Sequence, residues 1–278
     1  MVEAKKRFGQ NFLKDSTILY KIIQAMPNND NKLVEIGPGL GDLTRLLLRE
    51  KPLRAYEVDR DLCVYLNSEF DKEIKEGRLE LIEGDVLESF EKGSLSDTPY
   101  DLVANLPYYI ATKIILLALE DSMCKSMIIM IQKEVAEKFA SSSESKEFGS
   151  LAILAQSIAD VEILFDVPPE AFEPRPKVVS SILKIVKKRE YFPKEPQGVF
   201  EDKEDFERFK KYLKLSFSSP RKTWMKNISS FYDKKLAQNL LNEMDKPGTI
   251  RPHQLSVINH HKLYKRLNDA RKRIRQTE

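Results

Sequence analysis

The 278-residue sequence lacks any long apolar run. No stretch approaches the roughly 18 residues that read as a membrane-spanning helix. Near the N-terminus, Lys5, Lys6 and Arg7 are not followed by the apolar core of a signal peptide. Cys63 and Cys124 are isolated, and the three histidines show no spacing typical of zinc ligands. We therefore expect a cytoplasmic protein with reduced, buried cysteines, no metal site and no membrane partner.

The sequence also lacks tandem repeats and low-complexity tracts, and its length suits one sizeable domain plus a smaller one. Charge is unevenly distributed: residues 1–185 hold 23 Lys and Arg against 31 Asp and Glu, whereas residues 186–278 hold 23 against 12. We predict a catalytic domain over residues 1–186 and a basic, helical nucleic-acid-docking domain over residues 187–278, beginning with a proline-containing linker. The alternative for the basic half is an ordinary solvated helical surface.

Residues 33–44 show the pattern around which an α/β domain is organised. An apolar strand leads directly into Gly37, Gly39 and Gly41, and then into a helix with apolar residues at helical spacing. Such glycines let bare backbone approach a ligand. The dinucleotide-binding fingerprint needs a glycine at its sixth position, where this sequence has Asp42, so an NAD site is not indicated. A plain strand-to-helix turn is the alternative.

Polar side chains follow the next three predicted strands. Glu57 closes the second strand and lies 20 residues beyond Gly37, close to the ~20-residue spacing at which an acid meets ribose hydroxyls. Asp85 follows the third strand, and the fourth ends in Asn105. Because ligands bind at the carboxyl ends of parallel strands, these residues predict a binding site at one edge of the sheet.

Periodicity and turn residues predict the other elements. We expect helices starting near residues 15 and 133, helices over residues 59–70, 112–119 and 151–158, and helical structure beyond residue 203. Further strands are expected over residues 127–131, 161–165 and 179–186, and a polar surface loop over residues 88–99. The predicted fold class is α/β, with a seven-stranded, mostly parallel sheet and a small α-helical C-terminal domain.

Four prolines over residues 167–178 disfavour regular structure and stiffen the backbone around Phe172. A rigidly mounted aromatic ring suits the stacking of a nucleic-acid base. An anchor in the hydrophobic core is the alternative for this ring.

Together, the glycine loop, the two acids, the Asn-Leu-Pro-Tyr motif at residues 105–108 and the proline-rich loop resemble the ribosomal RNA small-subunit adenine dimethyltransferases of the KsgA type. The resemblance runs from Gly-Gln-Asn-Phe-Leu at residues 9–13 into the C-terminal helices. It implies a Rossmann-like methyltransferase with S-adenosylmethionine as cofactor. The expected cofactor contacts are Asn11, Leu13, Gly37, Gly39, Glu57, Asp85 and Asn105.

The resemblance further implies dimethylation of the exocyclic N6 amines of two adjacent adenines in the 3′-terminal hairpin loop of 16S ribosomal RNA. Such an amine is a poor nucleophile because its lone pair is delocalised into the ring. The Asn105 side-chain carbonyl and the Leu106 backbone carbonyl can accept its two N–H bonds, while Pro107 fixes the turn. Tyr108 and, by resemblance, Phe172 are expected to sandwich the base.

The implied partners are small-subunit ribosomal RNA and the pre-30S particle, bound by a monomer. The basic residues expected to contact RNA are Arg221, Lys222, Arg251, Arg271, Lys272 and Arg273. Two positions depart from the family pattern. Tyr109 stands where asparagine is common, which affects pocket shape, and Ser219-Pro220 stands where a further basic residue is frequent.

Three other functions fit part of the pattern: another adenine methyltransferase, an antibiotic-resistance methyltransferase of large-subunit ribosomal RNA, and a noncatalytic ribosome-assembly factor. Leu106 and the segment over residues 217–255 favour the small-subunit family over the large-subunit one. The intact acids and Asn105 argue against a noncatalytic factor.

Overall fold

The structure is a computed structural model that describes residues 5, 9–192 and 198–277, with side chains described as far as Arg271. The predicted linker over residues 187–197 therefore lies partly outside the described residues. Lys6 and Arg7 lie wholly outside them. The chain divides into two compact units: Met1–Ala136 with Ala159–Lys188, and Glu137–Ile158 with Arg189–Glu278. Within the described residues, no helix combines the length and apolar character needed to cross a membrane.

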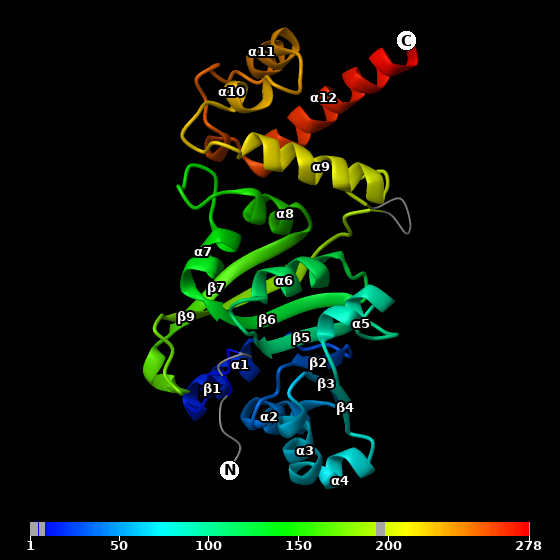
Figure 1. Ribbon diagram of the computed structural model, residues 1–278, viewed down its shortest axis with the longest axis vertical. Helices are drawn as coiled ribbons and strands as arrows, with labels where there is room; N and C mark the ends of the chain where they lie inside the picture. The colour runs from blue at the N-terminus through cyan, green and yellow to red at the C-terminus, as the bar shows by residue number, and fades with distance from the viewer. Residues whose placement is uncertain (1–4, 6–8, 193–197, 278) are drawn as a thin grey trace. The chain divides into compact units, whose positions relative to one another are not determined.

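The first unit is built on a seven-stranded sheet (Figure 1). Its strands are β2 (Lys32–Ile36), β3 (Leu53–Glu57), β4 (Leu79–Glu83), β5 (Tyr100–Asn105), β6 (Cys124–Gln132), β7 (Ala159–Val167) and β9 (Ser180–Lys187). Their spatial order is β4, β3, β2, β5, β6, β9, β7. Strands β2 to β6 pair in parallel, whereas β9 pairs antiparallel with both β6 and β7. The predicted seven-stranded, mostly parallel sheet is confirmed.

Helices cover both faces of this sheet (Figure 1). They are α1 (Ser16–Ala25), α2 (Asp42–Glu50), α3 (Arg60–Glu69), α4 (Asp71–Lys75), α5 (Val86–Lys92) and α6 (Ala111–Glu120), and α7 (Lys133–Ala140) follows β6. The chain runs outward from β2 to β3 and β4 and then returns to β5 on the other side of β2. Right-handed crossovers therefore place α2 and α3 on one face and α5 and α6 on the other. Since the strand order reverses between β2 and β5, a ligand crevice is expected at their carboxyl ends.

An aspartate side chain caps the start of three of these helices, α1, α3 and α5. Asp15 caps α1, its Oδ1 accepting the N–H groups of Thr17 and Ile18 at 2.8 and 3.1 Å. The apolar face of α1 is buried through Ile18 and Leu19, as the helical spacing predicted.

The segment over residues 88–99 corrects one prediction. It is not a surface loop throughout: α5 occupies its first part, and Leu95 in the remainder is fully buried. The Leu95 carbonyl accepts hydrogen bonds from Arg54 Nη1 and the Tyr56 hydroxyl, at 2.8 and 2.9 Å. The polar composition did not reveal this anchor, because both donors lie on a strand some forty positions earlier in the chain.

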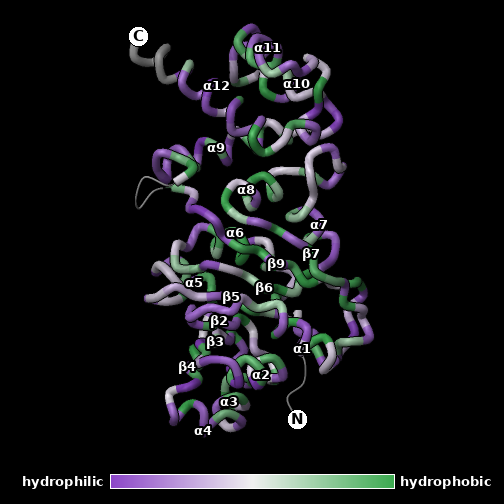
Figure 2. Tube along the Cα trace, turned by 180° about the vertical axis from the view of Figure 1, so that it is seen from behind, coloured by the Kyte–Doolittle hydropathy of each residue, from purple (hydrophilic) through white to green (hydrophobic). Residues whose placement is uncertain are grey.

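The second unit is helical. Its helices are α8 (Ser150–Ile158), α9 (Lys203–Ser216), α10 (Trp224–Ile228), α11 (Lys234–Glu243) and α12 (Val257–Thr277), with a short turn of helix, η3, at Pro252–Gln254. The described part of α12 is largely hydrophilic (Figure 2). Helical structure beyond residue 203 is as predicted.

The predicted boundary between residues 186 and 187 omits one segment of this unit. Residues 137–158 precede a sheet strand in the chain, yet they group with the C-terminal helices. Within the second unit α8 lies against α9 and α12, and the Tyr191 hydroxyl donates to the Leu154 carbonyl at 2.6 Å. Chain order concealed this grouping because α8 finds its apolar partners in helices that follow much later in the sequence.

Aromatic rings form the core of the second unit. Phe206 and Phe209, both on α9, are buried. Tyr191 stacks on Phe206 with ring centroids 4.2 Å apart, and Phe209 lies 4.8 Å from the ring of His261 and 5.1 Å from that of Tyr264. Helix α12 thereby carries a histidine into an apolar core.

The neighbouring His260 is fully buried, and its hydrogen bonds suit a neutral ring. Its Nε2–H donates to the Pro252 carbonyl at 3.0 Å, and in the neutral ring Nδ1 accepts from the Tyr212 hydroxyl at 3.1 Å. Burial lowers the pKa of His260 and of His261 to about 4. The unfolded chain therefore takes up these protons first as pH falls. We expect the free energy of unfolding to decrease below about pH 6.5, by about 2 kcal/mol for His260 near pH 5.

Urea unfolding, followed by near-ultraviolet circular dichroism at neutral pH and near pH 5, measures this loss. The variant His260→Gln removes the titrating ring, so its stability should differ less between the two pH values even if it is less stable at both. An equal difference in both proteins would contradict the assignment to His260.

Candidate active site

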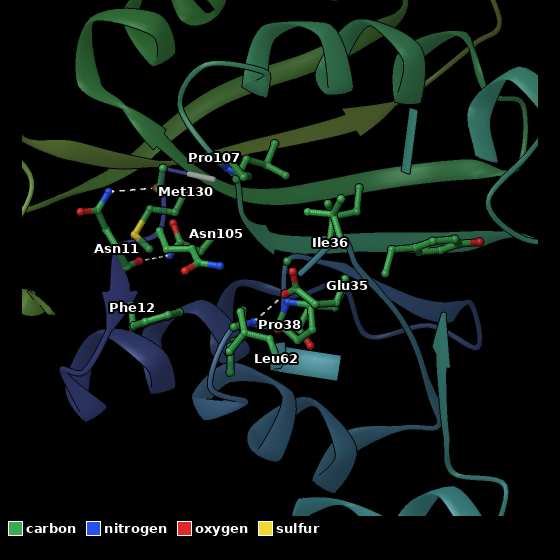
Figure 3. A pocket seen from close by; sticks show the side chains of 18 of the residues that line it. Asn11, Phe12, Glu35, Ile36, Pro38, Leu62, Asn105, Pro107 and Met130 are labelled. Carbon is green, nitrogen blue, oxygen red and sulfur yellow. Dashed lines mark hydrogen bonds between the residues drawn. The ribbon is translucent and has the colours of Figure 1, made fainter. Parts of the chain in front are cut away.

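A cavity of about 250 Å³ lies at the carboxyl ends of β2 and β5, where the strand order reverses (Figure 3). It is lined by the segment before α1, the glycine loop and the residues that follow β3, β4 and β5. All the predicted cofactor contacts are among its lining residues: Asn11, Leu13, Gly37, Gly39, Glu57, Asp85 and Asn105. The motif residues Leu106, Pro107 and Tyr108 line it as well. The fold thus gathers at one edge residues that lie up to about a hundred positions apart.

The glycine loop after β2 has left-handed φ angles of 71° at Gly37, 60° at Gly39 and 80° at Gly41. A Cβ at Gly41 would lie 2.5 Å from the Phe70 ring, and one at Gly39 would lie 2.9 Å from the Phe12 ring. These two glycines are therefore required by packing. A Cβ at Gly37 would meet no atom closer than 3.9 Å, so Gly37 is the position that presents open backbone to the cavity.

Glu57, the last residue of β3, is buried and rigidly held. Its Oε1 accepts the N–H of Asp59 at 2.9 Å, and its Oε2 accepts the N–H of Gly39 at 3.3 Å. Burial raises the pKa of this carboxyl, and the backbone hydrogen bonds oppose that shift. Because a carboxylate has about four lone-pair sites, each oxygen can still accept from a ligand.

Glu35 is a lining residue that the sequence analysis missed. It lies within β2 with 1% of its surface exposed, and its Oε2 is 2.7 Å from Thr44 Oγ1 of α2. Burial raises the pKa of Glu35 to about 8, and the charge of nearby Glu57 adds to the rise. A neutral carboxyl at pH 7 follows. The sequence feature that could have revealed Glu35 is an acidic residue inside an otherwise apolar strand.

Asp85 follows β4 and caps α5. Its Oδ1 accepts the N–H of Leu87 at 2.9 Å, which orients the carboxylate. Its Oδ2 accepts no hydrogen bond from the described residues, and the side chain is exposed where it lines the cavity. The predicted contact with an adenine amino group requires an oriented, accessible oxygen of this kind.

Asn105 ends β5, and its amide has a defined orientation (Figure 3). Its Nδ2 donates to the backbone carbonyl of Asn11 at 2.9 Å. A carbonyl oxygen can only accept, so the amide nitrogen must face it and Oδ1 must face elsewhere. The Asn11 side chain itself donates to the Gly9 carbonyl at 3.2 Å. Asn105 thus offers a preoriented acceptor.

The next three residues turn the chain into α6. Leu106 is buried, and its N–H donates to the Met130 carbonyl of β6 at 3.1 Å. The Pro107 carbonyl accepts the first hydrogen bonds of the turn. The Tyr108 hydroxyl lies 2.7 Å from Ser180 Oγ on β9, which fixes the half-buried ring. Burial raises the pKa of Tyr108, so the phenol stays neutral near pH 7.

Ion pairs tie the segment before α1 to the start of α3. Lys5 Nζ lies 2.5 Å from carboxylate oxygens of both Asp59 and Asp61, and Gln10 Nε2 donates to Asp59 at 3.0 Å. These partners, which the sequence analysis did not identify, hold the segment that supplies Asn11 beside the end of β3.

Tyr109, one departure from the family pattern, is 63% exposed and lines the cavity. Its ring lies 3.5 Å from where a Cβ at Gly9 would stand. The departure therefore falls on an exposed side chain and leaves the Asn105 acceptor unchanged.

The structure does not bring Phe172 into the cavity. This residue begins β8 (Phe172–Glu173), which follows a turn of helix, η2 (Pro169–Ala171), and pairs antiparallel with β1 (Phe12–Leu13). Its side chain is 3% exposed and packs in the main hydrophobic core. The core-anchor alternative therefore describes Phe172, because a ring buried to this extent offers no face to a base. The prolines indicated rigidity but could not show that strand pairing turns the ring inward.

The predicted RNA-binding residues belong to the second unit. They are Arg221, Lys222, Arg251 and Arg271, with Lys272 and Arg273, whose side chains lie outside the described residues. The first three side chains are exposed. The N–H of Trp224 donates to the Ile250 carbonyl at 2.8 Å, which joins the two segments that carry these three cations. Ser219, part of the other departure, accepts the N–H of Lys222 at 2.9 Å in a turn.

A family model described as ribosomal RNA adenine dimethylase matches residues 1–268 of the chain. The chain belongs to this family. It is 51% identical over 264 residues to the ribosomal RNA small subunit methyltransferase A of Sulfurimonas denitrificans, covering 95% of this chain and 94% of the relative. With the protein of the same name from Campylobacter curvus it shares 48% identity over 273 residues, covering 98% and 95%. The family resemblance inferred from the motifs is confirmed.

Solved structures show the same fold. A dimethyladenosine transferase from Plasmodium falciparum superposes with a TM-score of 0.74 at 24% identity, over 92% of this chain and 97% of that one. The 23S rRNA methyltransferase ErmE superposes with a TM-score of 0.70 at 22% identity, over 93% and 100%. At these identities the likeness concerns the fold alone, and it confirms the predicted Rossmann-like α/β fold.

Ribosomal RNA adenine dimethylases are S-adenosylmethionine-dependent enzymes, and the residues present fit that cofactor. The Glu57 carboxylate can accept ribose hydroxyls, and the unpaired Asp85 oxygen can accept from an adenine amine. Open backbone at Gly37 leaves room for the methionine end. This set of acceptors and bare backbone matches the three polar parts of S-adenosylmethionine.

Proposed function

We propose that this dimethylase modifies the N6 amines of two adjacent adenines in the 3′-terminal hairpin loop of 16S ribosomal RNA, during small-subunit biogenesis. Relatives named for small-subunit methylation match almost the whole chain at 43–51% identity. The observation that carries the proposal is the Asn105 amide, whose Nδ2 is held by the Asn11 carbonyl so that Oδ1 remains as an acceptor.

Bound S-adenosylmethionine supplies a methyl group on a positively charged sulfur. The chain must therefore make a delocalised adenine amine nucleophilic. Oδ1 of Asn105 and the backbone carbonyl of Leu106 accept the two N–H bonds, which draws the nitrogen toward tetrahedral geometry and turns its lone pair toward the methyl group. These hydrogen bonds strengthen as positive charge develops on nitrogen, so they stabilise the transition state more than the bound substrate. The methylated nitrogen carries a positive charge and is strongly acidic, so it releases one N–H proton to water and no strong general base is required.

Tyr108 positions the base. Its ring is half-buried and fixed through Ser180, so one aromatic face is available with little loss of side-chain entropy. Stacking of about 1 to 3 kcal/mol per base offsets removal of the adenine from its own stack. Unpaired loop nucleotides lose least on extrusion, which favours a hairpin loop over a duplex as substrate.

We further propose that the protein acts as a cytoplasmic monomer on the pre-30S particle, with its basic half docking the RNA. The excess of 23 cationic over 12 acidic residues after position 185 supports this role, as do the exposed side chains of Arg221, Lys222 and Arg251.

Replacing Arg221, Lys222 and Arg251 together by glutamine should weaken RNA binding and flatten its dependence on salt. Each lost phosphate contact changes the slope of log affinity against log salt by about 0.7, so a change of about 2 is expected. Fluorescence anisotropy across a salt series measures it. A double variant of two exposed lysines on α4, Lys72→Gln with Lys75→Gln, is the control. If the folded triple variant keeps the wild-type slope, these residues do not dock RNA.

Mass spectrometry of ribosomal RNA from cells with and without the protein tests the proposed reaction. Two dimethyladenines in small-subunit RNA that disappear without the protein are the expected result. Dimethyladenine appearing in large-subunit RNA instead would identify the antibiotic-resistance reaction. Unchanged RNA, together with no cofactor binding by calorimetry, would indicate a noncatalytic assembly factor.

A further inference from the structure

A second cavity, of about 410 Å³, lies within the helical unit. It is bounded by α9, by α12 and by the segment joining α10 to α11, and it shares no residue with the methyl-transfer cavity. The lining residues that matter here are Lys211, Lys214, Tyr212, Phe231, Tyr232 and Arg271. Methyl transfer uses none of them, although Arg271 is one of the residues expected to contact RNA.

One aromatic ring of this cavity, that of Phe231, is exposed to an unusual degree. Phe231 is 52% exposed, although phenylalanine side chains are usually buried. Its ring makes a T-shaped contact with the Tyr232 ring, with centroids 5.1 Å apart. The guanidinium carbon of Arg271 lies 3.8 Å from the Phe231 ring centroid. The Arg271 guanidinium therefore covers one face of the Phe231 ring, and the stacked pair gives the cavity a planar, cationic surface on which a base can stack.

Three of the four cationic side chains that line this cavity have no ion-pair partner among the described residues. Lys211 and Lys214 lie one helical turn apart on α9 with exposed side chains. Among the described residues, neither lysine nor Arg271 forms an ion pair, and no Asp or Glu lines the cavity. Arg208 on the same rim behaves differently, because Glu204 lies 3.0 Å from its guanidinium. The cavity thus combines a stacking plane with free cations.

An unpaired nucleotide has the matching chemistry. Its base stacks on aromatic rings and guanidinium planes, and its phosphates attract lysines. A base held in a duplex already stacks on its neighbours and cannot enter such a cavity. Acidic peptides would satisfy the lysines but would leave the flat Phe231 and Arg271 surface without a planar partner.

We propose that this cavity is a subsite for one unpaired nucleotide of RNA, with the base stacked on Phe231 and Arg271 and the flanking phosphates on Lys211 and Lys214. This proposal rests on the proposed function, because the RNA that enters the subsite is taken to be part of the ribosomal RNA substrate. The second unit then recognises single-stranded RNA, in addition to attracting the phosphate backbone by charge.

Anisotropy of the full-length protein with a labelled single-stranded RNA decamer, and with the same strand in a duplex, tests the subsite. Phe231→Ser should weaken binding of the single strand by about 5- to 100-fold, the range expected for one stacked base, and leave duplex binding within about 2-fold. Lys211→Gln with Lys214→Gln should flatten the salt slope for the single strand by about 1.4. Lys234→Gln with Lys235→Gln, two exposed lysines of α11 outside the cavity, should change neither quantity.

Circular dichroism establishes that each variant is folded. The variant with Lys211→Gln and Lys214→Gln alters only exposed side chains. Wild-type affinity for the single strand in both folded variants would overturn the proposal, and so would an equal loss of affinity for the duplex in Phe231→Ser. The same measurements distinguish a failure of the proposed function from a failure of the subsite. If the variants lose affinity for the single strand but the wild type dimethylates no adenine, the subsite stands and the proposed reaction is wrong.

Discussion

Asn105→Ala is expected to lower kcat for adenine methylation by about 10²- to 10³-fold, the usual cost of removing one preorganised group that stabilises charge in a transition state. The acceptor is preorganised because Nδ2 is already bonded to the Asn11 carbonyl at 2.9 Å, so no reorientation is needed when the amine nitrogen begins to carry charge. Single-turnover methylation of isolated small subunits at saturating cofactor measures the effect on the chemical step.

A second substitution separates chemistry from binding at this site. The Asn11 backbone carbonyl holds Asn105, whereas the Asn11 side chain donates to Gly9. Asn11→Ala therefore keeps the Asn105 orientation, and its effect should fall on cofactor affinity with kcat nearly unchanged. A near-normal single-turnover rate in Asn105→Ala would rule out the acceptor role.

Glu57→Gln is expected to weaken cofactor binding by about 10- to 100-fold while leaving RNA affinity unchanged. The carboxylate accepts two backbone N–H groups and has lone pairs left for the ribose. An amide replaces one acceptor oxygen by a donor that would face an N–H group, which leaves buried donors unpaired at about 1 to 3 kcal/mol. Isothermal titration calorimetry with S-adenosylmethionine measures the loss.

Glu83 provides a matched control. It pairs with Glu57 across the parallel strands β3 and β4, but it is exposed and does not line the cavity. Glu83→Gln should bind cofactor as the wild type does. Equal affinities for all three proteins would remove Glu57 from the cofactor site.

Sequence alone determined the framework and the family of this protein, because both are encoded locally. Strand β3 ends at Glu57, and β4 covers residues 79–83 as predicted, since short apolar runs bounded by turns and acids specify strands without distant contacts. The glycine loop and the Asn-Leu-Pro-Tyr motif likewise depend on residues adjacent in the chain. Parallel strands bring their carboxyl ends to one edge, so the motifs predicted a common site.

Tertiary structure decided the features that depend on contacts between distant residues. The Asn105 amide takes its orientation from Asn11, 94 positions earlier. Phe172 turns into the core because β8 pairs with β1, so its ring lies outside the cavity in which the proline-rich loop and the family resemblance had placed it beside the base.

Distant contacts also set the boundary between the units and created the second cavity. Segment 137–158 joins the helical unit because α8 finds its apolar partners on α9 and α12. The exposed Phe231, Arg271 and the α9 lysines line one cavity although they are up to about sixty residues apart. Periodicity reports which face of an element is apolar, but it does not report which distant element will cover that face.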